Sequence, residues 1–426
     1  MVVVPFIFFT ALAIHWWRKH QGIDVCVYMS ALYALTSLFA IIIVAGDMLG
    51  EGGIAFDDSD LELGFIPTLL YCFFIGLCIL PFSLIYKKDL NRISSRMPMV
   101  IDALSVFLIL EALLNFYLIA DSTLEILSGD LSTLRSDHYE GILSPAEVKA
   151  QSMPAILRFF YYFNASTILA LPIWFFNLTC RKVNWIFNTL LLLTSLSMPL
   201  AGIQVADRTE SVFYALMFVF CFLFFNKFIT PKLRRRIALT GTLLAALALT
   251  YLIAVSVARF EDRDGGTGQS MAQYAGQGYL NFCFFWEHGK FEYISPEREF
   301  PLTWAYAFHV TNSPERRAER SGEQGFFMSI FPSFIGDIML DLSPIGMIIW
   351  VLYYFLICCL LIKSSRRKEM DISDVLVIFV AAIVPTFGIF YYRLYNRASS
   401  FLVLIGLTVY VLSRYKLVYR CETEKE

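Results

Sequence analysis

Two arginines lie four residues apart near the C-terminal end of the chain, at Arg393 and Arg397. On a continuing helix they would share one face. The sequence has no acidic residue between Asp374 and Glu422, so neither arginine has a counter-ion close by in the sequence. Two neighbouring guanidinium groups can grip a diphosphate through paired hydrogen bonds. The alternative is that they pair with acids from another segment or anchor to lipid headgroups.

A third arginine, Arg208, lies between two apolar stretches and is followed by a helical pattern. Asp207 can cap that helix, with Glu210 at the third helical position. Arg208 would then lie at a helix N-terminus, where the helix dipole favours anions. The alternative is an interfacial arginine that extends to the lipid headgroups.

The acidic candidates fall into two groups. Asp337 and Asp341 lie four residues apart and precede a long apolar stretch. They could hold a cation, or one could act as a general base; the alternative is that they only complement the dipole at a helix start. Asp102 and Glu111 lie inside an apolar stretch, and acids inside a membrane are candidates for function. Asp102 could also lie near the boundary of the membrane.

A long segment, residues 258–330, carries the remaining candidates. Arg259, Arg263 and Arg298 lie in it beside several acids, and such mixed charge also fits a solvated surface. Its glycine- and aromatic-rich run contains Tyr279 and Asn281, which could lie against a sugar or a lipid, or form an ordinary turn.

No metal or cofactor site is indicated. No two of the five histidines have the spacing of metal ligands, and none lies near a cysteine cluster. The sequence also lacks a phosphate-cradling loop, a nucleophile elbow and a nucleic-acid signature. We therefore expect no cofactor, no metal and no nucleic-acid partner.

The composition indicates the elements that must position these residues. Hydrophobic residues make up 58% of the 426 residues and charged residues only 16%, whereas soluble domains carry roughly a quarter charged residues. A membrane-spanning helix needs about 20 apolar residues, and this predicts an all-α, polytopic bundle of about eleven transmembrane helices. The expected spans are residues 2–17, 25–46, 65–86, 98–120, 156–178, 185–203, 211–228, 237–257, 343–362, 375–391 and 399–413.

The distribution of lysine and arginine predicts the orientation. Most of the basic residues lie in alternate connections between the expected spans, and such residues favour the cytoplasm. We therefore expect an N-terminus outside the membrane and a cytoplasmic C-terminus. The basic residues of these connections are Arg18, Lys19, Lys87, Lys88, Arg92, Arg96, Arg181, Lys182, Lys227, Lys232, Arg234, Arg235, Arg236, Lys363, Arg366, Arg367, Lys368, Arg414, Lys416, Arg420 and Lys425.

The other connections would form the external surface of a single transmembrane domain, residues 1–426. A capping box with proline at the first helical position, at Ser144 and Pro145, predicts a helix that runs into the fifth span. The longest external loop, 258–330, lies between the eighth and ninth spans and contains Cys283, and its aromatic residues favour order at the membrane surface. The expected external loops are 47–64, 121–155, 204–210, 258–330 and 392–398.

This arrangement resembles the Wzy-type polymerases of bacterial surface polysaccharides, which join the repeat units of O-antigen or capsule. The resemblance covers most of the chain as topology. Locally it is carried by the step 206–209, which opens a span, by the run 274–282, and by the segment 331–346. The last resembles the family's glycine-containing entry to a late helix, with Ser343 where glycine is expected.

The resemblance implies a reaction at the outer face of the bacterial inner membrane. A growing glycan on undecaprenyl diphosphate would be transferred to the non-reducing end of a new lipid-linked repeat unit. The resemblance thus implies a glycan polymerase, a glycosyltransferase of the inverting type. Arg208, Arg393 and Arg397 would hold the diphosphate, and either Asp337 or His288 would take the proton of the acceptor hydroxyl. Membrane lipids, a flippase and a chain-length regulator are the partners that the resemblance implies.

The remaining candidates would form the surface that binds the glycan. They are Arg259, Arg263, Arg298, Tyr279, Asn281, Tyr392 and Tyr395.

Other readings of the sequence stay open. One is an O-antigen ligase or another lipid-linked sugar transferase, which the acidic pair Asp57 and Asp58 in the first external loop keeps possible. Another is a flippase or transporter, which would be expected to show repeats, broken helices and charges at mid-membrane. The sequence shows no convincing repeat and few such charges. A non-enzymatic scaffold is the third, and the Arg393 and Arg397 pair argues against it.

Overall fold

The computed structural model is that of a helical membrane protein. It describes residues 1–49, 63–86, 90–128, 145–161, 163–181, 183–203, 208–239, 241–242, 250, 266–291, 319, 321–322, 331–364, 369–395 and 397–423. Within these ranges, 6 helices are long and apolar enough to cross a membrane, and two shorter apolar helices follow. The prediction of an all-α membrane protein is thus confirmed, whereas the number of eleven spans stays a prediction. The 6 helices are Val25–Ala45, Phe65–Tyr86, Pro98–Ala120, Trp185–Gly202, Thr209–Phe228 and Ser333–Ser364.

The chain divides into two compact units. Unit 1 comprises Met1–Lys88, Asp262–Ser364 and Ala381–Ser400, and unit 2 comprises Asp89–Glu261, Ser365–Val380 and Phe401–Glu426. The prediction of a single transmembrane domain refers to how the chain is embedded in the bilayer, which this division does not test, and it stays a prediction. Each unit is described by itself below.

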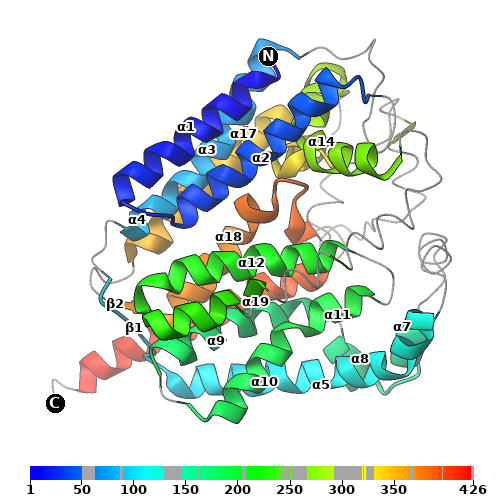
Figure 1. Cartoon of the computed structure of the whole chain (residues 1–426). Coiled ribbons are helices and arrows are strands. Elements are labelled where there is room, and N and C mark those ends of the chain that lie inside the picture. Colours follow the sequence, from blue (N-terminus) through cyan, green and yellow to red (C-terminus); the bar gives the residue numbers. More distant parts are fainter. Residues whose placement is uncertain are drawn as a thin grey trace. The chain divides into compact units, whose positions relative to one another are not determined.

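Unit 1 begins with a helical hairpin, α1 (Val3–His20) and α2 (Val25–Ala45), whose helices lie side by side (Figure 1). Gln21 ends α1 in a left-handed conformation with φ 56°. Asp24 then caps α2, because its carboxylate accepts hydrogen bonds from the N–H groups of Cys26 at 2.8 Å and Val27 at 2.9 Å. The short connection therefore fixes the antiparallel pairing of the two helices.

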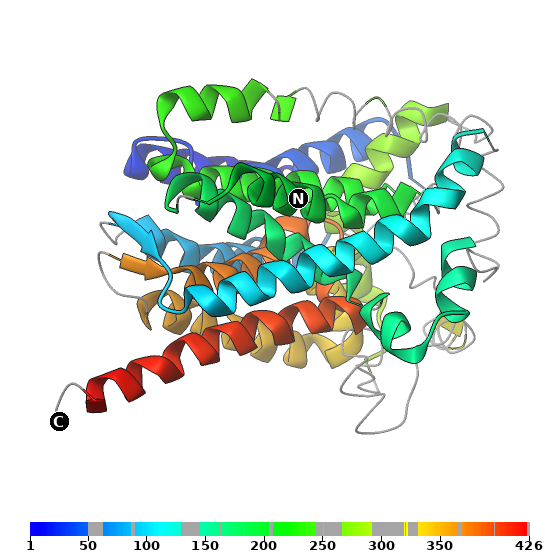
Figure 2. The same ribbon diagram turned by 90° about the horizontal axis from the view of Figure 1, so that it is seen from below.

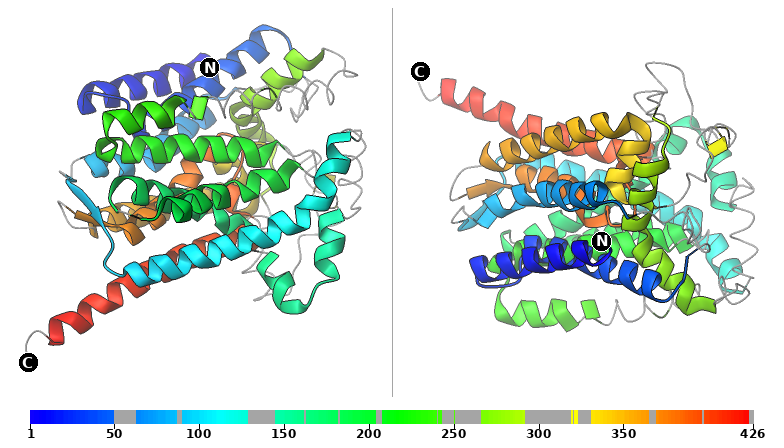
Figure 3. Two further views of the ribbon diagram at one scale, coloured as in Figure 1. Left: turned by 60° about the horizontal axis from the view of Figure 1, so that its bottom comes forward. Right: turned by 90° about the horizontal axis from the view of Figure 1, so that it is seen from above.

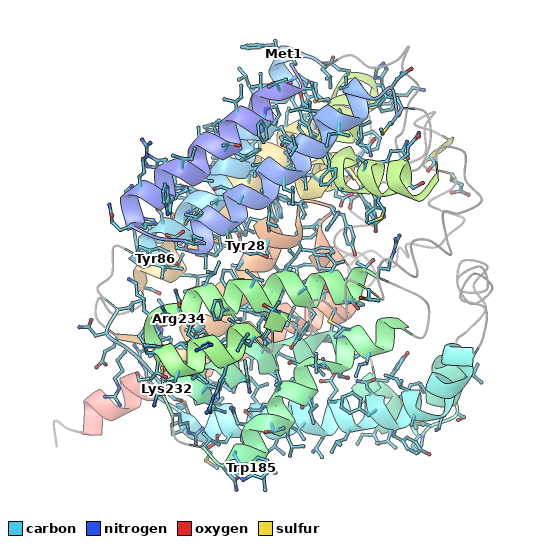
Figure 4. The ribbon with its side chains drawn as sticks, viewed as in Figure 1. Met1, Tyr28, Tyr86, Trp185, Lys232 and Arg234 are labelled. Carbon is cyan, nitrogen blue, oxygen red and sulfur yellow. The ribbon has the colours of Figure 1, made fainter. Side chains whose placement is uncertain are left out.

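The next apolar stretch of unit 1 is one helical rod in three pieces. It consists of α3 (Phe65–Ile79), the 3-10 turn η2 (Leu80–Phe82) and α4 (Ser83–Tyr86). Tyr86, labelled in Figure 4, closes the rod, and its hydroxyl accepts a hydrogen bond from the N–H of Val25 at 3.3 Å. The end of α4 therefore lies at the start of α2.

A helix of 23 residues, α14 (Gly266–His288), lies within the predicted external loop 258–330. It packs against α2, α3 and α17 inside unit 1, and Figure 3 shows it across the end of α2. Leu280, Phe282, Cys283 and Phe285 are all fully buried on it. This part of the predicted surface loop is therefore a core helix, and Cys283, expected in a loop, is a buried helical residue.

The late helices of the chain carry a break and a turn. Helix α17 (Ser333–Ser364) is interrupted at Ser343, whose φ of 67° and ψ of 168° are not helical and which precedes Pro344. Helix α18 (Ile372–Phe387) begins in unit 2 and ends in unit 1. A turn with the 3-10 segment η5 (Arg393–Tyr395) then leads to α19 (Arg397–Thr423). The predicted external loop 392–398 is thus largely helical.

Unit 2 begins with the long helix α5 (Pro98–Ser128), followed by α7 (Pro145–Gln151) and α8 (Ala155–Tyr161). Helix α7 begins at the proline that the capping pattern predicts. The fifth expected span, 156–178, is not one continuous helix, because the 3-10 segment η3 (Asn164–Leu169) separates α8 from α9 (Ala170–Thr179). The helix predicted from Pro145 therefore ends at Gln151 instead of running into the membrane.

The rest of unit 2 is built from α10 (Trp185–Ser195), α11 (Ser197–Ile203), α12 (Thr209–Phe225) and the 3-10 turn η4 (Asn226–Phe228). Aromatic side chains fill its core. Phe175 of α9 stacks on Phe225 with ring centroids 5.6 Å apart, and Phe220 of α12 packs on Phe379 at 6.2 Å.

Two short strands join distant segments of unit 2. Strand β1 (Arg92–Ser94) pairs in parallel with β2 (Glu369–Asp371), with Ile93 opposite Met370 (Figure 2). The Asp371 carboxylate extends the pairing, because it accepts a hydrogen bond from the N–H of Arg96 at 2.6 Å.

Two ion pairs of unit 2 also join segments that the charge pattern assigns to the cytoplasmic side. Arg181, after α9, donates to Asp102 near the start of α5 at 2.5 and 2.9 Å. These hydrogen bonds raise the pKa of the Arg181 guanidinium. Arg414, near the end of α19, lies 3.1 Å from Asp374 at the start of α18. Both ion pairs therefore join helix ends that the predicted order of spans places on the same, cytoplasmic side of the membrane.

Candidate functional site

The candidate site lies in unit 1, where α17 begins. The first N–H groups of a helix have no partner within it. Here the N–H of Ser333 donates to the Phe390 carbonyl and that of Phe334 to the Gly388 carbonyl, each at 3.0 Å. The turn that follows α18 is therefore fixed to the first turn of α17.

Asp337 lies one helical turn further along α17 and is fully buried. Its Oδ2 accepts a hydrogen bond from the N–H of Tyr392 at 2.7 Å. Such a bond to a carboxylate is charge-assisted and is shorter and stronger than a neutral one. Asp341, one turn later and also fully buried, lies on the same short half of α17, before the break at Ser343.

Arg393 belongs to the same turn and is only 4% exposed. Its Nη1 donates to the hydroxyl of Tyr391 at 3.1 Å. The guanidinium also lies 5.7 Å from the ring centroid of Phe387, within range of a cation–π interaction. A buried arginine and a buried aspartate thus belong to one cluster, which we call the α17 entry cluster: Asp337, Phe387, Tyr391, Tyr392 and Arg393.

Aromatic rings enclose the α17 entry cluster. Phe331 stacks on Tyr391 with ring centroids 5.1 Å apart. Trp350, in the second half of α17, meets the ring of Tyr392 edge-on at 5.5 Å. These rings exclude water and hold the tyrosines in place, which strengthens electrostatic interactions within the cluster.

Helix α14 closes the cluster from another side through a glycine. A Cβ at Gly278 would lie 2.8 Å from the Ile389 carbonyl oxygen, so only glycine allows this approach. Three residues later, Asn281 donates from Nδ2 to the Phe331 carbonyl at 3.2 Å. The glycine- and amide-containing run of α14 thus supports the turn that carries Arg393.

The arrangement combines a permanent cation, a carboxylate and phenolic hydroxyls in an enclosed place. The guanidinium can bind an anionic group such as a phosphate, and the carboxylate can accept a proton. Neither role needs a metal ion, and among the described residues no group of three or more His, Cys, Asp or Glu side chains could hold one.

Two other predicted residues of unit 1 have different surroundings. Tyr279 is 2% exposed, and its hydroxyl shares a hydrogen bond with that of Thr68 at 2.7 Å, so it joins α14 to α3. His288 is exposed at the end of α14, where it stacks on Phe284 with ring centroids 4.5 Å apart. It lies roughly 10 Å further along the helix than Asn281. Asp337 is therefore the candidate base that belongs to the cluster.

The remaining predicted residues lie elsewhere or outside the described part. Arg208 is half-buried in unit 2, where it is the N-cap residue of α12 but forms no side-chain capping bond. Arg397 begins α19, and its side chain and that of Tyr395 lie outside the described residues. So do Arg259, Arg263 and Arg298. A common site for Arg208 and the Arg393 and Arg397 pair stays a prediction.

Three aromatic residues of the site are not singled out by the sequence: Phe331, Trp350 and Phe387. Each lies in or beside an apolar helix, where aromatic side chains are ordinary core residues. The only signal that could have found them is the unusual density of aromatic residues on both sides of Arg393 and before Ser333.

The chain matches no protein-family model, no curated protein and no solved structure.

Proposed function

We propose that the protein is a membrane glycosyltransferase that polymerises lipid-linked repeat units of a surface polysaccharide. The observation that carries the proposal is the buried Arg393 guanidinium in one cluster with the Asp337 carboxylate. The helical membrane body and the resemblance of segments 274–282 and 331–346 to Wzy-type polymerases support it. Both segments contribute to the site, through Gly278 and Asn281 on one side and Ser333 and Asp337 on the other.

The chemistry follows from the leaving group. The acceptor hydroxyl attacks the anomeric carbon of the growing glycan, and the bond from that carbon to the lipid diphosphate breaks. The diphosphate is already a good leaving group, so it needs positive charge more than a proton. Each hydrogen bond from an arginine would contribute about 1.5–3 kcal/mol. Arginine stays protonated at all relevant pH values, which suits this role.

The base accepts the proton of the acceptor hydroxyl. Asp337 is the better candidate, because it shares the cluster with Arg393, whereas His288 is exposed and makes its described contacts only with Phe284. Arg208 and Arg397 would add further positive charge to the diphosphate. Undecaprenyl diphosphate, an inner-membrane location and an external active site belong to the proposal through the resemblance.

A second candidate function is a flippase for the same class of lipid. Helix α17 is broken at Ser343, and α8 and α9 are separated by η3. Broken helices are typical of transporters, whose substrates bind where helices unwind. The interrupted helices therefore favour a flippase or transporter over the ligase and the non-enzymatic scaffold among the alternative functions.

The test is a gel ladder of surface glycan from a strain that lacks the gene. It is complemented with wild type, Arg393→Ala, Arg393→Lys, Asp337→Asn or His288→Ala. Arg234→Ala is the matched control, because the side chain of Arg234, labelled in Figure 4, is exposed and donates to the Asn226 carbonyl at 3.1 Å, outside the α17 entry cluster. The amount of each protein in the membrane is measured in parallel.

For a polymerase, deletion leaves single repeat units, and wild type and Arg234→Ala restore the ladder. Arg393→Ala and Asp337→Asn should abolish it at normal protein levels, and Arg393→Lys should restore it poorly because lysine lacks the paired donors. If deletion removes surface glycan altogether, including single units, a flippase or ligase replaces the polymerase.

A further inference from the structure

Unit 2 contains a carboxyl group that the proposed reaction does not use. Helix α5 presents one buried face, on which Ser105, Leu108, Glu111, Ala112 and Asn115 are at most 1% exposed. Its opposite face carries exposed apolar residues such as Leu110 and Leu113. Glu111 is therefore at the centre of the buried face of a helix that is apolar enough to cross a membrane.

Glu111 has one polar contact. Its Oε2 accepts a hydrogen bond from the hydroxyl of Ser166 in η3 at 2.9 Å. Its Oε1 is buried and has no hydrogen-bond partner among the described residues. A charged carboxylate in such a place would have one oxygen without any compensation, which is strongly unfavourable in a low-dielectric interior.

One helical turn further along α5, a second polar contact joins the same elements. Asn115 donates from Nδ2 to Oδ1 of Asn164 at 3.0 Å, and the Ser197 hydroxyl donates to the same oxygen at 3.2 Å. Asn164 and Ser166 are both in η3, the 3-10 segment that interrupts the helix. The polar side chains of α5, η3 and α11 thus form a buried layer around Glu111.

No positive charge compensates Glu111 in the described part of unit 2. Four of the elements that pack on α5 carry no charged residue. They are η3, α9, α10 and α11. Lys149 of α7 contacts Tyr117, with Nζ 4.0 Å from its ring. Arg158 lies in α8, whereas the described hydrogen bond of Glu111 is with Ser166 of η3. Glu147 of α7 has its side chain outside the described residues, and Asp102 of α5 pairs with Arg181.

We propose that Glu111 is a proton-binding site: the carboxyl group holds one proton at neutral pH and is the group through which unit 2 takes up or releases a proton. The carboxylate binds a proton from water on Oε1 and becomes the neutral acid, while Oε2 keeps the hydrogen bond from Ser166. A proton fits better than a sodium ion, because a metal cation on Oε1 would require several further oxygen ligands. Among the described residues, no group of three or more His, Cys, Asp or Glu side chains could hold such an ion.

The test is infrared spectroscopy of the purified full-length protein in lipid nanodiscs, in choline chloride, as a function of pH. A protonated carboxyl band should be present at pH 7 in wild type and be lost in Glu111→Gln. Ser166→Ala should keep the band and shift it to higher wavenumber, because the carbonyl loses its hydrogen bond. Asp102→Asn is the control and should leave the band unchanged, since Asp102 is paired with Arg181.

The outcomes separate the possibilities. A band that disappears when sodium chloride replaces choline chloride identifies a sodium site and overturns the proposal. The absence of any protonated carboxyl at pH 7 also overturns it. Thermal unfolding gives an independent check. Tm of wild type should fall as pH rises above the range where an ordinary glutamate ionises, because the unfolded chain then loses this proton while the folded protein keeps it. Tm of Glu111→Gln should not show that fall. If Glu111→Gln fails to fold, the wild-type and Ser166→Ala spectra still decide.

Discussion

Arg393 and Asp337 are ionisable side chains that the fold removes from water, and each is held by groups of the turn that follows α18. The ring of Phe387 and the hydroxyl of Tyr391 contact the Arg393 guanidinium, and the N–H of Tyr392 donates to the Asp337 carboxylate. Replacing Arg393 would therefore also disturb the packing of this turn, so activity measurements on its variants need the protein-level control described above.

The thiol of Cys283 is predicted to be unreactive. Burial raises its pKa from an ordinary 9.0 to about 12, against hydrogen bonds with Tyr279 and Thr68 that lower it. At pH 8 the reactive thiolate is then about a thousandfold rarer than at an ordinary cysteine. In a variant in which Cys283 is the only cysteine, a maleimide should label the unfolded protein but not the folded one.

The matched control for this labelling is Met271→Cys in a background without other cysteines. Met271 lies on the same helix and is 42% exposed. Rapid labelling there together with none at Cys283 is the expected pattern. Equal labelling at both positions would show that Cys283 is as accessible as Met271, as expected if this part of the chain lies in the external loop that the sequence predicts.

At the scale of elements, the sequence predicts some helices well and others poorly for identifiable reasons. The spans 25–46 and 65–86 coincide closely with α2 and with α3 to α4, because long uniform apolar runs leave few alternatives. Helix α14 is not predictable in the same way. Its glycines and amides resemble loop composition, but they serve close packing, as the approach of Gly278 to Ile389 shows.

The sequence also predicts only part of the candidate site. The sequence identifies Arg393 from its missing local counter-ion and Asp337 from its place before a span. It does not identify that a turn after α18 would place them in one cluster, because that contact joins segments more than fifty residues apart in the chain, such as Tyr392 and Asp337. The interruption in η3 was not predictable from the apolar pattern, because the expected span 156–178 runs through it. At Ser343 the expected span 343–362 begins, but the pattern does not show that a helix already precedes it.

Ser343→Gly is predicted to stabilise the protein. A φ of 67° with a ψ of 168° is a conformation that glycine adopts readily, and a non-glycine residue there costs about 1–3 kcal/mol. Glycine should recover most of that cost, less about 0.5–1 kcal/mol for its greater freedom in the unfolded chain. A rise in Tm in detergent would show it. Ser105→Gly inside α5 is the contrasting variant and should lower Tm by the cost of a helical glycine.

Gly278→Ala is predicted to destabilise unit 1. The new methyl group would meet the backbone carbonyl of Ile389, which cannot move without displacing the turn that carries Arg393. Overpacking of this kind costs about 1–3 kcal/mol. Thermal unfolding of the purified protein measures the loss.

Gly268→Ala is the control on the same helix, because nothing lies within 4 Å of a Cβ at that position. It should leave Tm unchanged or raise it slightly through better helix propensity. If both alanine variants behave alike, the close approach at Gly278 does not contribute to stability.

At the scale of the whole molecule, contacts within each unit sort the helix ends into sets. In unit 1, His20, Asp24 and Tyr86 bring together the end of α1, the start of α2 and the end of α4. In unit 2, the strand pair and the Asp102–Arg181 and Asp374–Arg414 ion pairs do the same. All of these ends belong to connections rich in lysine and arginine, so packing and charge distribution favour the same alternation of spans.

The charge distribution further predicts which set of ends faces the cytoplasm. Arg18 and Lys232 lie in the basic connections, whereas Asp47 and Lys290 lie in the expected external ones, and all four are exposed. In a background without other cysteines, Asp47→Cys and Lys290→Cys should react with a membrane-impermeant maleimide on intact spheroplasts. Arg18→Cys and Lys232→Cys should react only in inverted membrane vesicles; Figure 4 labels Lys232.

Reaction of Arg18→Cys and Asp47→Cys from the same side would mean that α2 does not cross the membrane. The reverse pattern at all four positions would instead invert the protein and place the α17 entry cluster on a side where the proposed polymerisation could not occur.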